Sequence, residues 1–196
     1  MNEEKTLLTA TIKGLESGIP ELQLAALESA KELAPIDTMP HILTLYLNEA
    51  ADPQVTKGAM QLLIDIRHPA LVTALGEALQ SNLSHEKRAG LLSLCWQNPI
   101  DFSPLIGEML NALLSESALV VIEAMTALEL ALDYASIEQI RTTLSQLKTL
   151  AKGECPKDNR TFIDECVSIT AQYLQQAENT LREEARYEQE KHNHDH

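Results

Sequence analysis

The chain is poor in aromatic residues and glycine, and these shortages restrict the possible folds. Phe, Trp and Tyr together make up 4% of its 196 residues, and Gly occurs only 7 times. So few glycines argue against a fold with many tight β-hairpins, and no alternating run of β-branched residues predicts a strand. The apolar residues are mostly Leu and Ala, which favour helices. We therefore expect an all-α protein.

Basic residues are also scarce, with 15 Lys and Arg against 29 Asp and Glu, which gives a net charge of -14. Nucleic acids and anionic membrane surfaces are bound through basic side chains, so we expect neither as a partner. No apolar run approaches the roughly 20 residues of a membrane-spanning helix. The first 14 residues, MNEEKTLLTATIKG, are too polar for a signal peptide. These features predict a cytoplasmic protein.

Residues for catalysis or for binding a cofactor are missing from the expected patterns. The three cysteines, Cys95, Cys155 and Cys166, form no CxxC pair, so we expect free thiols instead of disulfides or a zinc ribbon. The sequence contains no HExxH, no GxSxG and no glycine-rich phosphate loop. We therefore predict no catalytic residue, no cofactor and no metal site.

Helix-start signals recur along the chain. Asp52 and Ser103, each followed by Pro, have the pattern of an N-cap residue with proline at the first helical position, and Pro40 could open a helix in the same way. Ser136 and Gln139 have the spacing of a capping box. These signals predict helices at residues 3–17, 20–34, 39–51, 53–66, 69–82, 85–98, 103–114, 116–133, 136–152 and 159–190.

The predicted helices form pairs, and the second helix of each pair recurs at similar intervals. The intervals are 33, 31, 31 and 44 residues, and the last is lengthened by the loop at 152–158. Nearly equal intervals indicate one repeated helical hairpin, which stacks into an α-solenoid. The second helices begin near Pro20, Pro53, Ser84, Ser115 and Asn159.

Two segments resemble the second helix of a HEAT repeat: DPQVTKGAMQL at 52–62 and PELQLAAL at 20–27. The family typically has Asp, then Pro or a small residue, then Val, Arg and Ala, and Lys57 stands here in place of the Arg. The resemblance covers residues 3–176 and implies a right-handed α-α superhelix, a HEAT/ARM-like solenoid of about five helical hairpins. We accordingly predict a solenoid over 1–176 and a charged helical extension with a histidine-containing tail over 177–196.

The segment SALVVIEAMTALELAL at 117–132 is apolar almost all the way round a helix, yet contains Glu123 and Glu129. The inner helix of a stacked repeat fits this pattern, because it packs on several sides and leaves a narrow stripe in water. Glu123 could be a buried catalytic carboxylate. We favour a place on the exposed stripe, because an unpaired buried carboxylate is costly.

The same region is acidic, since no Lys or Arg occurs between Arg88 and Arg141. Inner helices line one face of a solenoid, so Glu86, Glu116 and Glu123 are candidate contacts for a partner protein or basic peptide. An acidic surface that is only solvated is the alternative.

These observations give three hypotheses for function. The first is a non-enzymatic interaction scaffold that binds a protein or a basic peptide. The second is an enzyme or metal-binding protein with a degenerate site near His85, Glu86 and Glu123. The third is a structural protein that self-associates through apolar surface at a terminal repeat. Alternating histidines in the tail could chelate a metal or belong to a disordered polar end; they are His192, His194 and His196.

Overall fold

The computed structural model describes residues 2–194, and within this range all the regular elements are helices, as the composition predicts. Ten α-helices and two short 3-10 turns occur in these residues. Their bounds are α1 Asn2–Leu15, α2 Pro20–Ala30, α3 Pro35–Leu47, α4 Pro53–Asp65, α5 Ala70–Leu79, α6 His85–Gln97, η1 Ser103–Leu105, α7 Ile106–Ala112, α8 Ala118–Leu132, α9 Ile137–Lys152, η2 Lys157–Asn159 and α10 Arg160–His194.

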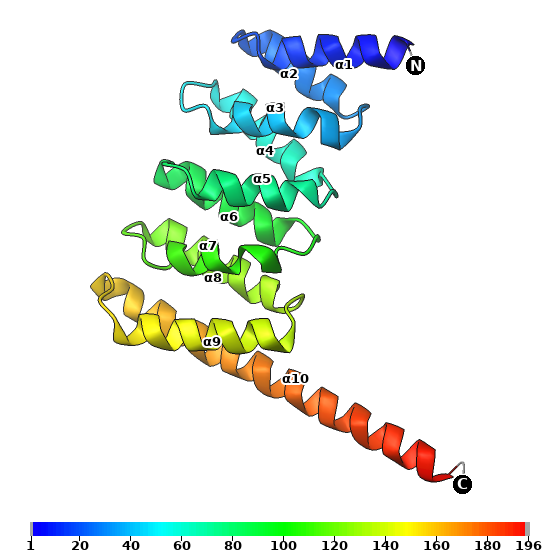
Figure 1. The fold of residues 1–196 in the computed structure, drawn as a ribbon. Coiled ribbons are helices and arrows are strands. Elements are labelled where there is room, and N and C mark those ends of the chain that lie inside the picture. The colour runs from blue at the N-terminus through cyan, green and yellow to red at the C-terminus, as the bar shows by residue number, and fades with distance from the viewer. Residues whose placement is uncertain (1, 195–196) are drawn as a thin grey trace. The chain divides into compact units, whose positions relative to one another are not determined.

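The chain divides into two compact units, which we call unit 1 (Met1–Pro104) and unit 2 (Leu105–His196). Unit 1 contains α1 to α6, and unit 2 contains α7 to α10 (Figure 1). The predicted boundary between residues 176 and 177 stays a prediction.

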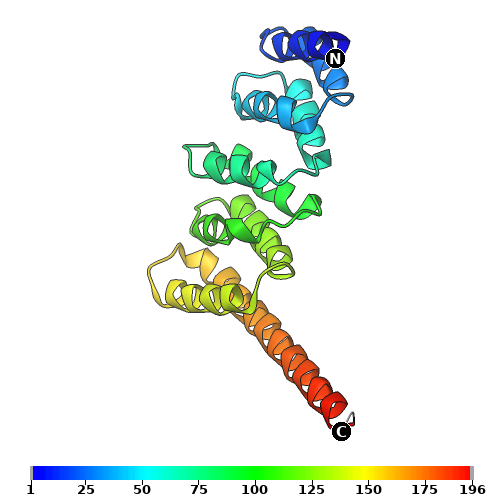
Figure 2. The same ribbon diagram turned by 45° about the vertical axis from the view of Figure 1, so that its right-hand side comes forward.

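Unit 1 consists of three helical pairs. Helix α1 packs on α2, α3 on α4, and α5 on α6. The pairs also contact one another, because α2, α4 and α6 pack in succession and α1, α3 and α5 do the same (Figures 1 and 2). The residues between them are mostly buried Leu, Ile and Ala, among them Ile42, Leu63, Leu71 and Leu91.

Unit 2 contains two pairs, α7 with α8 and α9 with α10, and α8 also packs on α10. The second half of α10 extends beyond α9 (Figure 2). Arg141 of α9 forms an ion pair with Glu178 of α10, with 2.8 Å between Nη2 and Oε1. Further along α10, Leu181 and Tyr187 are 53% and 71% exposed, so this end of the helix lacks a packed side.

Two of the predicted helix starts are confirmed by their caps. The Asp52 carboxylate accepts a hydrogen bond of 2.8 Å from the backbone N–H of Gln54 at the start of α4. Ser136 and Gln139 form the complete capping box of α9, with the two reciprocal bonds at 3.3 and 2.9 Å. These interactions are local, so the sequence signal is sufficient.

Two other helix starts were predicted wrongly. Helix α3 begins at Pro35 and not near Pro40, which lies inside the helix and lacks the N–H that would bond to Ile36. Ser103 does not cap an α-helix, because it is buried in the 3-10 turn η1, and α7 begins only at Ile106. The backbone N–H of Ser103 instead donates to the Asp101 carboxylate at 2.8 Å.

Candidate functional site

Helix α8 of unit 2 carries the candidate site. It begins after Ser117, whose backbone N–H donates to the Ser115 hydroxyl at 3.2 Å. One side of the helix is fully buried against the rest of unit 2, and α7 and α10 are its neighbours there. The buried residues are Val120, Val121, Ala124, Ala127, Leu128, Ala131 and Leu132.

The opposite side of α8 exposes large apolar side chains. Leu119, Ile122 and Leu130 are 52%, 45% and 39% exposed, and half-buried Thr126 lies between them. The spacing of three, four and four residues places the four side chains on one helical face, which we call the α8 stripe. Contiguous exposed apolar surface of this kind is typical of binding sites.

This stripe differs from the sequence-based prediction, in which the apolar residues of the helix were buried and the glutamates occupied the surface facing water. The exposed surface contains the apolar α8 stripe as well as the acids. Glu116 is exposed, but it lies in the turn before the helix, because α8 begins at Ala118. Glu123 is half-buried on α8, beside Ile122 in the sequence.

Two further carboxylates, Glu129 of α8 and Asp133 at its C-cap, interact with residues of α10. Asp133 accepts a hydrogen bond from the Tyr173 hydroxyl; burial and this bond together raise the pKa of Tyr173 to about 12. Burial, together with the nearby charges of Glu165 and Glu129, raises the pKa of the Cys166 thiol to about 12. A thiol with so high a pKa is protonated at neutral pH and therefore unreactive. Glu123 follows Ile122 and Glu129 precedes Leu130 in the sequence, so acidic residues flank the α8 stripe.

The other predicted contact, Glu86, belongs to unit 1. It lies with His85 in the first turn of α6, where both side chains are exposed. The hydroxyl of Ser84 caps this helix and accepts a hydrogen bond of 3.3 Å from the backbone N–H of Lys87. Among the described residues, no group of three or more His, Cys, Asp and Glu side chains could hold a metal ion. The side chains of His192, His194 and His196 lie outside the described part of the structure.

A buried lysine next to Glu86 was not predicted from the sequence. Lys87 is 6% exposed, and its Nζ lies 4.6 Å from the centroid of the Tyr46 ring, a cation–π contact. The Tyr46 hydroxyl donates to the Lys87 carbonyl at 3.4 Å. Burial lowers the pKa of Lys87, and the negative charges of Glu49 and Glu86 oppose this effect. The two residues are 41 positions apart, so no local pattern could reveal the contact.

Glycine at position 90 permits this contact. A Cβ on Gly90 would overlap the Tyr46 hydroxyl and would lie 3.0 Å from Cε of Met60. A glycine inside a helix usually has a packing reason, so Gly90 is the one sequence signal that indicated a close neighbour on α6.

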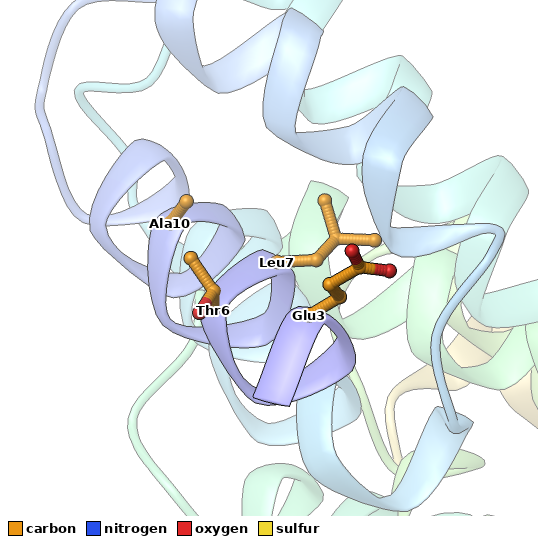
Figure 3. Close-up of a pocket in the computed structure, with 4 residues that line it drawn as sticks. All are labelled: Glu3, Thr6, Leu7 and Ala10. Carbon is orange, nitrogen blue, oxygen red and sulfur yellow. The ribbon is translucent and has the colours of Figure 1, made fainter. Parts of the chain in front are cut away.

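Three of the surface cavities formed by the described residues each lie within one unit. One, of about 410 Å³, is an open depression along α1, where Glu3, Thr6, Leu7 and Ala10 line it (Figure 3). A second, of about 400 Å³, lies between α7 and α9 and is lined partly by neutral polar side chains, among them Asn111, Gln146 and Thr149. The third, of about 250 Å³, lies where α2, α3 and α4 meet and is walled by aliphatic side chains.

Compared with protein-family models, with curated proteins and with solved structures, the chain matches none. Argument about function therefore depends on the residues themselves. Within residues 2–194, no helix is both long enough and apolar enough to cross a membrane.

Cys95 and Trp96 lie near the end of α6. Cys95 is a free thiol, as predicted, and it is buried, which raises the pKa of the thiol to about 12. Trp96 is 38% exposed, so part of its ring is accessible to a partner.

Proposed function

We propose that the protein is a non-enzymatic interaction scaffold and that the α8 stripe binds a basic amphipathic helix of a partner protein. The observation that carries the proposal is the exposure of Leu119, Ile122 and Leu130 along one face of α8. Contact between apolar side chains and water is unfavourable. Each of these side chains is already about half buried, so covering the rest would contribute about 0.7–1.5 kcal/mol per side chain.

The partner's chemistry follows from the stripe and its border. An amphipathic helix can place apolar residues at positions i, i+3, i+4 and i+7 against an apolar face. Its flanking Lys or Arg side chains would then lie near Glu116 and Glu123, in a region without Lys or Arg between Arg88 and Arg141. Surface charge attraction of this kind raises the association rate and is screened by salt.

The packing inside each unit supports a HEAT-like solenoid as the fold class. Helices α2, α4 and α6 pack in succession in unit 1, and α8 packs on α10 in unit 2. In a right-handed α-α superhelix of HEAT-like hairpins, the second helices present one face to a partner, which is the role proposed for α8. The free cysteines fit a reducing compartment such as the cytoplasm.

Site-specific photo-crosslinking tests the proposal. A photoreactive amino acid at position 122 of the full chain, in a lysate of the native organism, should capture a protein segment with net positive charge and helical apolar spacing. A probe at position 22 is the matched control, because Leu22 is 49% exposed on α2. Capture at position 122 should fall as salt is raised, since the flanking charges are screened.

Two variants separate the apolar and the acidic contributions. Leu119→Ser with Ile122→Ser should abolish capture by a probe placed at Thr126, and Glu116→Lys with Glu123→Lys should weaken it strongly. Both variants should keep the wild-type circular dichroism spectrum. The same proteins captured at positions 122 and 22, or captured segments that are acidic, would contradict the proposal.

Self-association through α1 is a second candidate. Leu7 is 41% exposed on α1 in the depression of Figure 3, and Ile19 before α2 is 49% exposed. Exposed apolar side chains at a terminal repeat can associate with a second copy of the chain. Sedimentation velocity over a hundredfold range of protein concentration should then show a dimer that Leu7→Glu abolishes; a monomer throughout would exclude it.

A further inference from the structure

The cavity at the junction of α2, α3 and α4 has the properties of a small-molecule site. It measures about 250 Å³ and lies entirely within unit 1. Leu33, Ile42 and Ile66 line it and are 8%, 1% and 5% exposed, so these side chains are held in place by the core behind them. A cavity with such buried walls is largely preformed.

The volume of the cavity and its aliphatic lining favour a ligand with a hydrocarbon group. An apolar cavity of about 150 Å³ is large enough to bind benzene, so a cavity of 250 Å³ accommodates a chain or ring of about six carbons with a small head group. Leu62 and Pro35 extend the aliphatic wall, and Thr38 contributes one hydroxyl. A strongly polar ligand would lose its hydration there without recovering enough hydrogen bonds.

The charged residues at the opening of the cavity determine which charge is favourable on the head group of a ligand. Lys31 lies at this mouth, but its Nζ is 2.8 Å from both carboxylate oxygens of Glu28, so its charge is already compensated. Asp65 also lines the mouth, is exposed, and has no ion pair among the described residues. Its carboxylate is therefore the charge that a ligand would meet.

The ends of the two helices near the cavity already have basic residues beside them. Lys31 is the C-cap of α2, and Arg67, just beyond α4, donates to the carbonyl of Ile64. The partial negative charge of each helix end is therefore compensated, and Asp65 remains as the group that would attract a cation.

We propose that this cavity binds a small amphiphilic cation, with a hydrocarbon portion of about six carbons inside and an ammonium or guanidinium group beside Asp65. The site is independent of the α8 stripe, because it lies in unit 1 and takes a ligand of another class.

Titration of the full chain with hexylamine, followed by amide chemical shifts, tests the proposal. Saturable shifts are expected at the turn between α2 and α3 and at the end of α4. Hexanol should bind in the same place about threefold more weakly, since the pairing with an exposed carboxylate is modest. Hexanoate should bind more weakly than hexanol. Shifts that do not saturate, or binding of hexanoate as strong as that of hexylamine, would overturn the proposal.

Three variants locate the site. Leu62→Phe fills the cavity and should abolish binding of hexylamine and hexanol. Asp65→Asn should lower the affinity for hexylamine about threefold and leave that for hexanol unchanged. Glu77→Gln, an exposed change on α5, is the control that should alter neither. Asp65 is exposed, so Asp65→Asn should stay folded even if Leu62→Phe does not. If Asp65→Asn still bound hexylamine more tightly than hexanol by the same factor as the wild type, the pairing of the ammonium group with Asp65 would be refuted.

Discussion

Unit 1 and unit 2 each contain one asparagine whose side-chain amide joins the end of one helix to another hairpin. In unit 1, Nδ2 of Asn98 donates to the carbonyls of Ile64 and Ile66 at 3.0 and 2.7 Å. In unit 2, Nδ2 of Asn159 donates to the carbonyls of Leu113 and Ser115 at 2.9 and 2.7 Å. We call each of these an asparagine bridge. The carbonyls at a helix end have no partner within the helix, so both bridges satisfy the same need.

The units differ in where they place polar and apolar groups beyond these bridges. Unit 1 buries a lysine, Lys87, against Tyr46 and beside Gly90, which orders two side chains from two hairpins. Unit 2 exposes Leu119 and Ile122 on α8. Unit 1 also exposes apolar side chains, such as Leu7 and Leu22, but these lie on different helices, whereas α8 of unit 2 exposes several along one face. Under the proposed function, that face is the surface that a partner covers.

The largest effect is expected from breaking an asparagine bridge. Asn98→Asp keeps the shape but replaces the amide donor with a carboxylate that faces two carbonyl oxygens. We expect a loss of about 3 kcal/mol in the free energy of unfolding, because a buried carboxylate then faces two carbonyl oxygens and the Ile66 carbonyl loses its donor, while the Ile64 carbonyl keeps its bond from Arg67. Asn159→Asp should cost a similar amount. Chemical denaturation measures both values.

Amide hydrogen exchange shows whether each substitution destabilises only the unit that contains it. Asn98→Asp should increase exchange in α4 and α6, and Asn159→Asp should increase it in α7 and α10. Exposed Asn82→Asp and Asn179→Asp are the controls, and both should stay within about 0.5 kcal/mol of the wild type. A loss below about 1 kcal/mol for both bridges would show that the bonds are dispensable.

The next largest effect is expected from replacing one helical glycine in each unit with alanine. Gly90→Ala places a Cβ against the Tyr46 hydroxyl and should destabilise unit 1 by about 1–3 kcal/mol. Gly107→Ala in α7 meets nothing within 4 Å and should stabilise unit 2 by up to about 1 kcal/mol, because alanine favours a helix. Thermal unfolding of the two variants would give shifts of opposite sign. A stabilising Gly90→Ala would mean that Tyr46 moves away without cost.

A smaller effect is expected at Lys87. Burial lowers its pKa, so the unfolded chain binds the proton more tightly, and stability should rise as pH rises toward about 10.4. Lys87→Met removes this rise and should be neutral or stabilising by about 1 kcal/mol at pH 7. Denaturation at several values from pH 7 to 9.5 measures it, with exposed Lys57→Met as the control.

The pH range ends at 9.5 so that the effect of Lys87 on stability can be measured without a contribution from the ionisation of Tyr46. Burial raises the pKa of Tyr46, and the charges of Glu86 and Glu49 add to this effect. A phenol with a raised pKa in the folded state costs stability once the pH exceeds its unfolded value of about 10, which is the opposite sign. Equal pH dependence in the wild type and in Lys87→Met below pH 9.5 would contradict the role given to the lysine.

Local signals in the sequence were sufficient for most of the helices. The cap at Asp52 and the capping box at Ser136 depend on residues two or three positions away, and both were predicted. Pro35 and Pro40 are equally suitable as a first helical residue, and burial of Thr38 and Met39 in the core favours the earlier start. Whether Thr38 and Met39 become buried depends on tertiary packing, which neighbouring residues in the sequence do not reveal.

The candidate site was predicted only in part for the same reason. The unusual apolar character of 117–132 and its acidic surroundings directed attention to α8 and to Glu116 and Glu123. Which of its apolar residues would remain exposed depends on how far α7 and α10 cover the helix, and periodicity cannot give that. The buried Lys87 was missed because its partner, Tyr46, is distant in the sequence.

The smallest effect on stability is expected at the α8 stripe. This prediction is the strictest test of the view that the stripe is surface and not part of the core of unit 2. Leu119→Ser removes an apolar side chain that is 52% exposed and should change the free energy of unfolding by no more than about 0.5 kcal/mol. Val120→Ala, one residue further along the same helix, removes two methyl groups from a fully buried site and should cost about 2 kcal/mol. Denaturation of the two variants gives both values. A large loss in Leu119→Ser would mean that Leu119 belongs to the core of unit 2. A negligible loss would mean that the fold gains little from this leucine, so the exposed half of its side chain is available for a partner to cover.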